Sequence, residues 1–351
     1  MAKILEINKI SGNTTLNFPF ASRRNFFGDI TMTHLKIQRS PQCFKDSVEL
    51  MMGYVRHQME QETADKLLYF HNFAHVQGVR ERAELIFDAV RPHWQAELNQ
   101  LHDPLDLERM RDLLSLAAVA HDMVQDFLPA QPWTARRREQ GVSEYATVNK
   151  LLEAIAELNA DLAEQQPDKP DLQFSDADCE VLREAIAATI CDFDPSDRAI
   201  FQPYLYTDDE KSNVAIILAL ADIGALAIEG IDAFRQEGRE IFLEENLDFV
   251  PLVLHPQELE QYPHDTKIAL RETLLGRARF QIGFATGRIN RLPFETRDLP
   301  AQALITLQNE VFTYANQRTL NELKDTTPTS PETSLEELLN YFSFDRIPVH
   351  F

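Results

Sequence analysis

Two histidines in the segment LLYFHNFAHVQGV are spaced so that both could act on one bound group. His71 and His75 are four residues apart, and on a helix the side chains at positions i and i+4 lie on the same face, one turn apart. Two imidazoles on one face can bind a metal ion or perform an acid–base step, and they can equally lie in a polar patch without chemistry. Partner residues elsewhere in the chain have to decide between these alternatives.

Carboxylates in apolar surroundings are the first such partners. His121 and Asp122 close the apolar run LLSLAAVA, and Asp222 lies inside VAIILALADIGALAI, a segment that is apolar on every face and therefore predicts a buried helix. Buried acids are normally paired or bound to a metal, because an isolated ionised carboxylate is unfavourable there. The run around Asp222 contains no Lys or Arg. A salt bridge to a distant residue is the structural alternative, and we favour a metal site.

The predicted metal ligands are four residues on three helices, namely His75, His121, Asp122 and Asp222. Two imidazoles and two carboxylates without a thiolate suit Zn²⁺, Mn²⁺, Fe²⁺ or Mg²⁺ better than a soft metal or an iron–sulfur cluster. A carboxylate can also bridge two ions, so a second ion beside Asp122 stays open. The expected cofactor is therefore one or two divalent metal ions.

The order of these residues resembles the HD superfamily of metal-dependent phosphohydrolases, and within it the all-helical class I cyclic-nucleotide phosphodiesterases. Their YHNxxH segment is similar to FHNFAH at residues 70–75, with Phe in place of Tyr. Their HD pair is similar to His121-Asp122, and their AD pair on a late helix to Ala221-Asp222.

Two further segments extend this resemblance, which covers residues 67–288. QIGF, residues 281–284, looks like the Gln-x-Gly-Phe segment with which those enzymes clamp a purine, and Thr189 lies in IAATICDFD, which resembles their Ala-Thr-Asp stretch. The resemblance implies that Gln281 and Phe284 bind a base by amide hydrogen bonds and stacking. Core packing is the alternative for Phe284.

The sequence also departs from the family pattern. The HDxxH motif reads HDMVQ here, so Gln125 replaces a third histidine that would help to order a metal-bound water. Glutamine can hydrogen-bond a water but cannot take up a proton. Thr189 is followed by Ile190 instead of Asp, while Ser143-Glu144 resembles a pair found in simpler bacterial HD hydrolases. Gln125 and Thr189 are expected beside the metal ligands, and the pattern predicts an HD phosphohydrolase more specifically than a cyclic-nucleotide phosphodiesterase.

The resemblance implies hydrolysis of a small phosphoester, with a nucleotide as the favoured class, by a metal-bound hydroxide. His71 would protonate the leaving oxygen as general acid, and Glu144 or Asp222 would orient the attacking water. Asn72 would brace His71 or another group beside the ligands. Arg137, in the run ARRREQ, would bind the substrate phosphate by paired hydrogen bonds, although such a run is more often a solvated helix end.

Two alternatives stay open at this point. A catalytically weak or inactive HD-fold module could bind a nucleotide or a protein partner in a regulatory role, and the glutamine at position 125 supports this alternative. Oxidation at a di-iron HD site would need more histidine ligands. The remaining candidates, His93, His102, His255 and His264, do not lie on obvious buried faces.

The charge of the chain limits its partners. Its 351 residues include 56 acidic and 34 basic side chains, a formal net charge of −22, which argues against nucleic acid or an anionic membrane surface as a partner. The longest apolar run, residues 214–228, is too short to cross a bilayer. Cys43, Cys179 and Cys191 lack metal-like spacing and are typical of small buried thiols in a reducing compartment, so we expect a cytoplasmic protein. The oligomeric state is left open.

Helical periodicity predicts an all-α, multi-helix bundle of HD type at residues 44–324. An N-terminal extension, residues 1–43, is irregular or forms a β-hairpin from KILEINKI and TTLNFPF, and residues 325–351 are expected to be a mobile linker and a C-terminal helix. Pro92 is expected to end the helix that carries both histidines, and Arg82 is expected to face water. The main predicted helices are residues 46–60, 64–90, 106–121, 143–162, 176–189, 213–233, 267–288 and 301–324.

Overall fold

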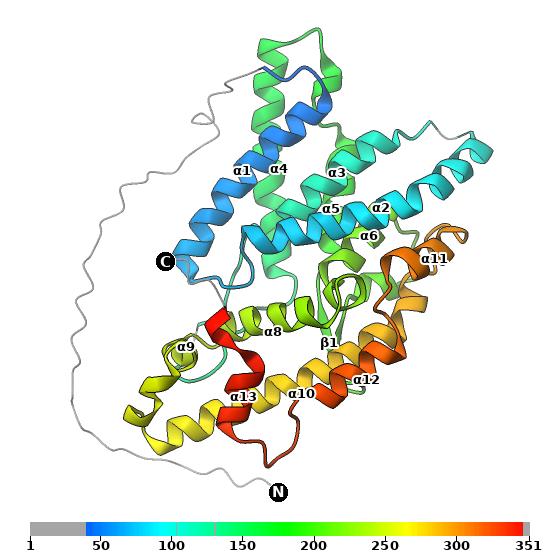
Figure 1. Cartoon of the computed structure of the whole chain (residues 1–351). Coiled ribbons are helices and arrows are strands. Elements are labelled where there is room, and N and C mark those ends of the chain that lie inside the picture. The colour runs from blue at the N-terminus through cyan, green and yellow to red at the C-terminus, as the bar shows by residue number, and fades with distance from the viewer. Residues whose placement is uncertain (1–39, 103, 130, 347–351) are drawn as a thin grey trace, which may run out of the picture. The chain divides into compact units, whose positions relative to one another are not determined.

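The computed structural model describes residues 40–346, except residues 103 and 130, and this part of the chain consists mainly of helices (Figure 1). The all-α, multi-helix prediction is confirmed. The predicted N-terminal hairpin lies outside the described residues.

The elements follow one another in this order. The helices are α1 (Phe44–Lys66), α2 (Phe73–Leu101), α3 (Leu107–Ala120), α4 (Val142–Gln165), α5 (Asp176–Ala187), α6 (Asn213–Asp222), α7 (Ala225–Ile228), α8 (Ile231–Glu245), α9 (Val250–Leu254), α10 (His264–Glu295), α11 (Ala303–Thr306), α12 (Gln317–Thr326) and α13 (Leu335–Phe342). Short 3₁₀ turns lie at Pro170–Leu172, Pro203–Tyr206, Leu247–Phe249, Pro256–Gln261 and Phe344–Arg346, and a π turn at Leu307–Val311. Strands β1 (Asp192–Asp194) and β2 (Ala199–Phe201) form an antiparallel pair.

Two apolar helices place predicted ligands at their ends. All residues of α3 from 113 to 120 and all residues of α6 from 214 to 221 are buried. α3 packs against α1, α2 and α5, and α6 packs against α2, α3 and α5. His121 directly follows α3 and Asp222 ends α6, so both polar side chains meet where the apolar helices stop.

The chain turns between α1 and α2 at residues 67–72, which the sequence places inside the predicted helix 64–90. Leu67 follows α1 in the left-handed backbone region, with a φ of 54°. Asn72 then caps α2, because its side-chain oxygen accepts hydrogen bonds from two N–H groups of the first turn, including that of His75. His71 therefore lies in the turn ahead of α2, and the prediction that it shares a helical face with His75 is wrong.

Pro92 does not end α2, which is a second correction. The helix continues to Leu101, although a proline removes one backbone hydrogen bond. Pro92 itself is exposed, while Val90, Trp94 and Leu98 continue the buried stripe of the helix past it. The packing of this stripe outweighs the local loss.

Two other predicted helices are interrupted. The segment 213–233 is divided into α6, α7 and the start of α8, and Gly230 precedes α8 with a φ of 93°, which favours glycine. The segment 301–324 is divided into α11, the π turn and α12, whose first turn is capped by the Asn316 side chain. The first break matters for the site, because Asp222 becomes the last residue of α6.

The hairpin β1–β2 has no counterpart among the predicted elements. It lies against α10, where Gly283 leaves room for it, since a Cβ atom there would lie 2.7 Å from the carbonyl oxygen of Arg198. The hairpin brings Gln202, which follows β2, beside Asp222. The sequence gives no local signal for this approach, because it depends on tertiary packing.

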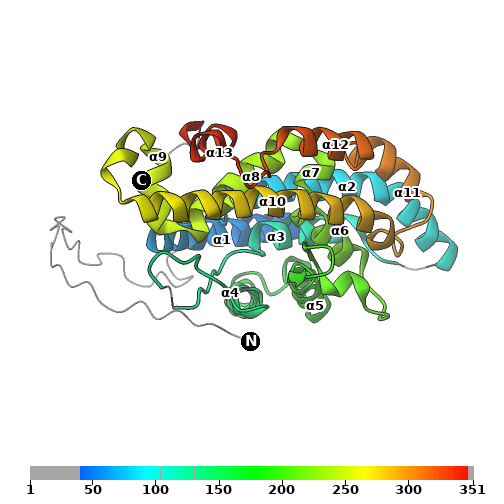
Figure 2. The same cartoon turned by 90° about the horizontal axis from the view of Figure 1, so that it is seen from below.

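The C-terminal helix α13 packs on α10, and Figure 2 shows α12 and α13 along α10 on the side away from α4 and α5. Its apolar face, including Phe342, is buried, and Ser334 begins the helix with a capping box. The segment ahead of it, which the sequence predicts as a mobile linker, makes side-chain contacts with α10. For example, the Arg271 guanidinium of α10 donates to the carbonyl oxygen of Thr333 (2.7 Å).

None of the described helices is long and apolar enough to span a membrane. The three cysteines are unpaired, and Cys179 and Cys191 are partly buried. Cys43 is exposed at the start of α1, so the expectation of a buried thiol is wrong at this position.

Arg109 of α3 and Asp178 of α5 form an ion pair that joins these two helices. The guanidinium nitrogens lie 2.8 and 2.6 Å from the two carboxylate oxygens, and the same carboxylate accepts the N–H of Ser175 at the start of α5. Burial alone would raise the pKa of Asp178, but these hydrogen bonds outweigh burial and hold the pKa below its usual value.

We expect Asp178→Ala to lower the free energy of unfolding by about 2 kcal/mol at neutral pH, because it removes the partner of Arg109 and part of the α5 cap. The Asp178 contribution is complete above the ordinary carboxyl pKa and is lost as pH falls through the lower folded pKa. Urea unfolding at several pH values should therefore show wild type and variant converging in acid. Asp176→Ala, at an exposed position of the same turn, is the control, and equal losses in both variants would contradict the prediction.

Candidate metal centre

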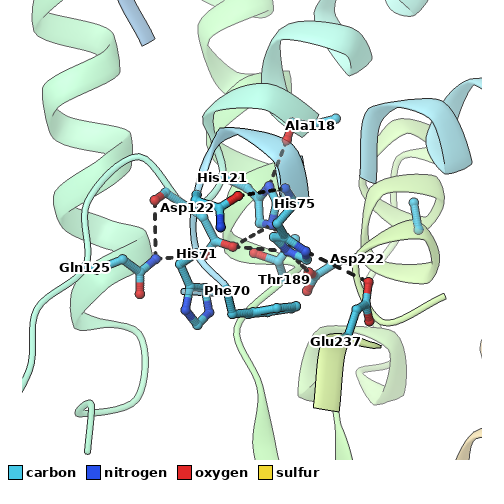
Figure 3. Close-up of polar contacts among 12 residues, drawn as sticks. Phe70, His71, His75, Ala118, His121, Asp122, Gln125, Thr189, Asp222 and Glu237 are labelled. Carbon is cyan, nitrogen blue, oxygen red and sulfur yellow. Dashed lines mark hydrogen bonds and ion pairs between the residues drawn. The ribbon is translucent and has the colours of Figure 1, made fainter. Parts of the chain in front are cut away.

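The four predicted ligands come together at one point (Figure 3). His75 lies in the first turn of α2, His121 and Asp122 directly follow α3, and Asp222 ends α6. One ligand atom from each residue lies within 4.8 Å of the others. Nε2 of His121 is 3.0 Å from Oδ2 of Asp122 and 3.3 Å from Oδ1 of Asp222. Nε2 of His75 is 3.4 and 3.8 Å from the same two oxygens.

The hydrogen bonding of His121 indicates that a cation fits between these atoms. Its Nδ1 lies 2.8 Å from the carbonyl oxygen of Ala118, and a carbonyl oxygen only accepts, so we assign the proton to Nδ1. Nε2 of the neutral ring is then an acceptor, yet it faces two carboxylate oxygens that are acceptors as well. Nε2 of His121 and both ring nitrogens of His75 are buried without a hydrogen bond among the described residues. A divalent ion would satisfy Nε2 of both histidines and the two carboxylate oxygens that face them.

Protons and a metal ion compete for the same imidazoles. Burial alone would lower the pKa of His121, but Asp122 and Asp222 outweigh it and hold the pKa well above its usual value. Burial and the same carboxylates act on His75, whose pKa is also raised. Conversely, burial would raise the pKa of both carboxyls, and the histidines hold each pKa below its usual value. Binding of a metal ion at this site would therefore release protons.

Each carboxylate turns one oxygen to the centre and has the other held by a buried glutamine. Nε2 of Gln125 donates to Oδ1 of Asp122 (3.0 Å), and Nε2 of Gln202 donates to Oδ2 of Asp222 (3.3 Å). Gln125 lies beside a ligand, where the sequence places it. Gln202 is missed by sequence analysis, because it follows a two-strand turn and approaches the site only through the packing of β2.

Arg82 fixes the end of α6 that carries Asp222. Its guanidinium donates to the carbonyl oxygens of Ala221 (3.0 Å) and Asp222 (3.2 Å) and pairs with Glu237 of α8 (2.5 Å). Glu237 in turn lies 4.0 Å from Nδ1 of His75. Arg82 is 3% exposed, so the expectation that it faces water is wrong. A signal for its burial is present, since Arg82 lies seven residues after His75 and thus on the same face of α2.

His71 lies beside the centre and is oriented by Glu244, which sequence analysis does not identify. One carboxylate oxygen of Glu244 contacts Nδ1 of His71, and the other accepts the N–H groups of Phe70 (2.9 Å) and His71 (3.0 Å). Burial would raise the pKa of Glu244, but His71 and these N–H groups outweigh burial and lower the pKa to about 2. The spacing of Glu237, Ile241 and Glu244 places them on one face of α8, which is the signal that could have found both acids. Asn72 caps α2 and makes no hydrogen bond to His71.

A cavity of about 690 Å³ opens beside the centre. Among its lining residues are His71, Asp122, Asp222 and Glu144. Burial raises the pKa of Glu144, and the nearby Asp122 and Asp222 act in the same direction. The ligand centre, the oriented histidine and a carboxylate of raised pKa therefore share one space.

The residues predicted to bind the base, Gln281 and Phe284, and the predicted neighbour of the metal ligands, Thr189, differ in the contacts that they make. Gln281 is buried and its side-chain oxygen accepts the hydroxyl of Tyr341 (3.1 Å). Phe284 stacks on Phe234 and Phe280, so it has packing partners and also faces the cavity. The hydroxyl of Thr189 donates to the carbonyl oxygen of Ile186 (2.8 Å). Gln281, Phe284 and Thr189 all line the cavity.

The three arginines of ARRREQ line this cavity too, in three different environments. Arg136 is a structural anchor, because its guanidinium donates to the carbonyl oxygens of Glu244, Lys66 and Leu67. Arg138 donates to Oε1 of Gln125 (2.6 Å). Arg137 is exposed at the cavity. Arg138, which is also exposed at the cavity, is therefore a second candidate for the phosphate contact predicted at Arg137.

No family model, curated protein or solved structure matches this chain. The resemblance to HD phosphohydrolases therefore rests on the sequence motifs.

We expect Gln202→Met to weaken Mn²⁺ binding about tenfold, because it frees one oxygen of Asp222 and lets the ligand turn. Methionine is similar in size and removes a side-chain oxygen of Gln202 that is buried without a hydrogen bond, so the melting temperature should change little. Isothermal titration calorimetry measures the binding. Gln95→Met, at an exposed position of α2, is the control, and an unchanged affinity in Gln202→Met would show that Gln202 does not position Asp222.

Proposed function

We propose that this protein is an HD-type, metal-dependent phosphohydrolase that cleaves a small phosphoester. The observation that carries the proposal is the meeting of two imidazoles and two carboxylates, with facing acceptor atoms, at the wall of a cavity that also contains His71. Mixed nitrogen and oxygen ligands of this kind suit Zn²⁺, Mn²⁺, Fe²⁺ or Mg²⁺. The sequence resemblance supports the same reaction class.

His71 is the proposed general acid. A divalent ion at the centre would supply Lewis acidity to the phosphoryl oxygen and lower the pKa of a water. Glu244 engages Nδ1 of His71, which leaves Nε2 to give a proton to the leaving oxygen, and the carboxylate stabilises the charged ring. Glu144, with its pKa raised by burial, would accept a hydrogen bond or a proton from the attacking water.

The walls of the cavity favour a substrate with an anionic and an aromatic part. Arg137 and Arg138 line one region, where guanidinium groups would bind phosphate oxygens. Phe280 and Phe284 line the cavity as well, and aromatic faces can stack on a base. A nucleotide combines both parts, so we infer that the substrate is a nucleotide.

We also infer that the protein works in the cytoplasm and without a nucleic-acid or membrane partner. The net charge of −22 disfavours binding to polyanions, and the three cysteines are unpaired, as a reducing compartment would keep them.

Hydrolysis with Mn²⁺ tests this proposal, with bis(p-nitrophenyl) phosphate for turnover and 5′-AMP, whose leaving ribose oxygen needs a proton, for the general acid. On 5′-AMP we expect His71→Ala to lower kcat by about 10²-fold or more, because it removes the general acid, while the Mn²⁺ content stays that of the wild type. Asp222→Ala should lose both the metal and the activity. His93→Ala, at a partly buried position far along α2, is the control. Wild-type turnover by His71→Ala would contradict the proposed role, and metal binding without turnover by the wild type would favour a binding module.

A further inference from the structure

Gln125 is held by hydrogen bonds of both its side chain and its backbone. Its side-chain nitrogen donates to Oδ1 of Asp122 (3.0 Å), and its side-chain oxygen accepts from Arg138 (2.6 Å). Its backbone carbonyl accepts from Lys66 (2.7 Å), and its backbone N–H donates to Glu62 (3.4 Å). The side chain is 1% exposed. Both ends of its amide are therefore committed to fixed partners.

The consequence concerns the outer oxygen of Asp122. Oδ2 faces the two histidines, and Oδ1 is the atom through which this carboxylate would reach a second ion. The side-chain nitrogen of Gln125 already donates to Oδ1. The side-chain oxygen of Gln125 in turn accepts from the positively charged guanidinium of Arg138. Among the described residues, the one group of metal-binding side chains here is the set of four. The Gln125 amide and the Arg138 guanidinium therefore lie on the side of Asp122 where a second ion would bind.

Local backbone structure places Arg138 for this contact. Phe127 and Arg138 form an isolated antiparallel bridge, and the N–H of Leu128 donates to the carbonyl oxygen of Arg137 (2.8 Å). The Arg136 anchor fixes the same segment to α8 and to the end of α1. Arg138 is exposed and lines the cavity, so N–H groups not used by Gln125 remain for a ligand, because a guanidinium has five donors.

We propose that the centre holds a single divalent ion and that the Gln125–Arg138 pair takes the place of a second cation beside Asp122. This inference rests on the proposed function. Arg138 supplies to the substrate phosphate the positive charge that a second ion would otherwise supply. Gln125 links Arg138 to the Asp122 carboxylate by hydrogen bonds at both ends of its amide. The glutamine in HDMVQ is then part of a one-ion design, and it does not indicate a lost activity.

Titration with Mn²⁺, monitored by calorimetry and by electron paramagnetic resonance, tests the number of bound ions. We expect the wild type to saturate with one Mn²⁺ per chain and to give the spectrum of an isolated ion. Two bound Mn²⁺ ions with a spin-coupled spectrum would overturn the one-ion inference and leave the hydrolase proposal intact. Failure to bind any Mn²⁺ would overturn both, so the two failures are distinguishable.

Binding of inorganic phosphate to the Mn²⁺-loaded protein tests the role of Arg138. Arg138→Gln should still bind one Mn²⁺ but should bind phosphate about tenfold more weakly, since it loses a charge-assisted hydrogen bond, and Arg138→Lys should recover part of the affinity. Arg183→Gln, at an exposed arginine of α5 paired with Glu180, is the matched control. Equal phosphate affinity in Arg138→Gln and the control would overturn the assignment.

Discussion

The burial of two carboxylates beside two imidazoles is the constraint on which the rest of this structure depends. Asp122 lies just after the apolar helix α3 and Asp222 ends the apolar helix α6, both behind runs of buried residues, and ionised groups in such places need a counter-charge. The facing imidazoles can provide it only by holding extra protons, and the Nδ1 contact of His121 makes its Nε2 an acceptor in the neutral ring. A divalent cation resolves the same conflict without protonation, and its four ligands are already in place.

The surrounding polar groups limit how the four ligands can move. Arg82 ties the last carbonyls of α6 to α8, and Gln202 and Gln125 each hold the outer oxygen of one carboxylate. His71 is positioned separately, because Glu244 contacts it and the backbone turn ahead of α2. The candidate centre thus combines four closely placed metal-binding side chains with a histidine held beside them, and all of these residues lie at or near the ends of helices.

The residues of the candidate metal centre can be predicted from the sequence because a charged residue in an apolar run is a local signal, as Asp222 shows. The same reasoning overextended the helices, since periodicity does not detect a cap such as Asn72 that competes with helix continuation. Glu244 and Gln202 could not be placed, because each acts through a contact between segments that are far apart in sequence. Arg82 was recoverable from its spacing to His75, but its charge suggested exposure, and the partners that make its burial favourable lie on α6 and α8.

The central claim is that these four side chains bind a divalent metal ion. Its most direct test is the metal content of the purified protein by mass spectrometry, with the wild type beside the double variant His121→Ala/Asp122→Ala, each after incubation with Mn²⁺ and removal of free ions. The account predicts about one equivalent in the wild type, in line with a four-ligand site, and almost none in the double variant. Equal metal contents in the two proteins, whether high or negligible, would contradict it.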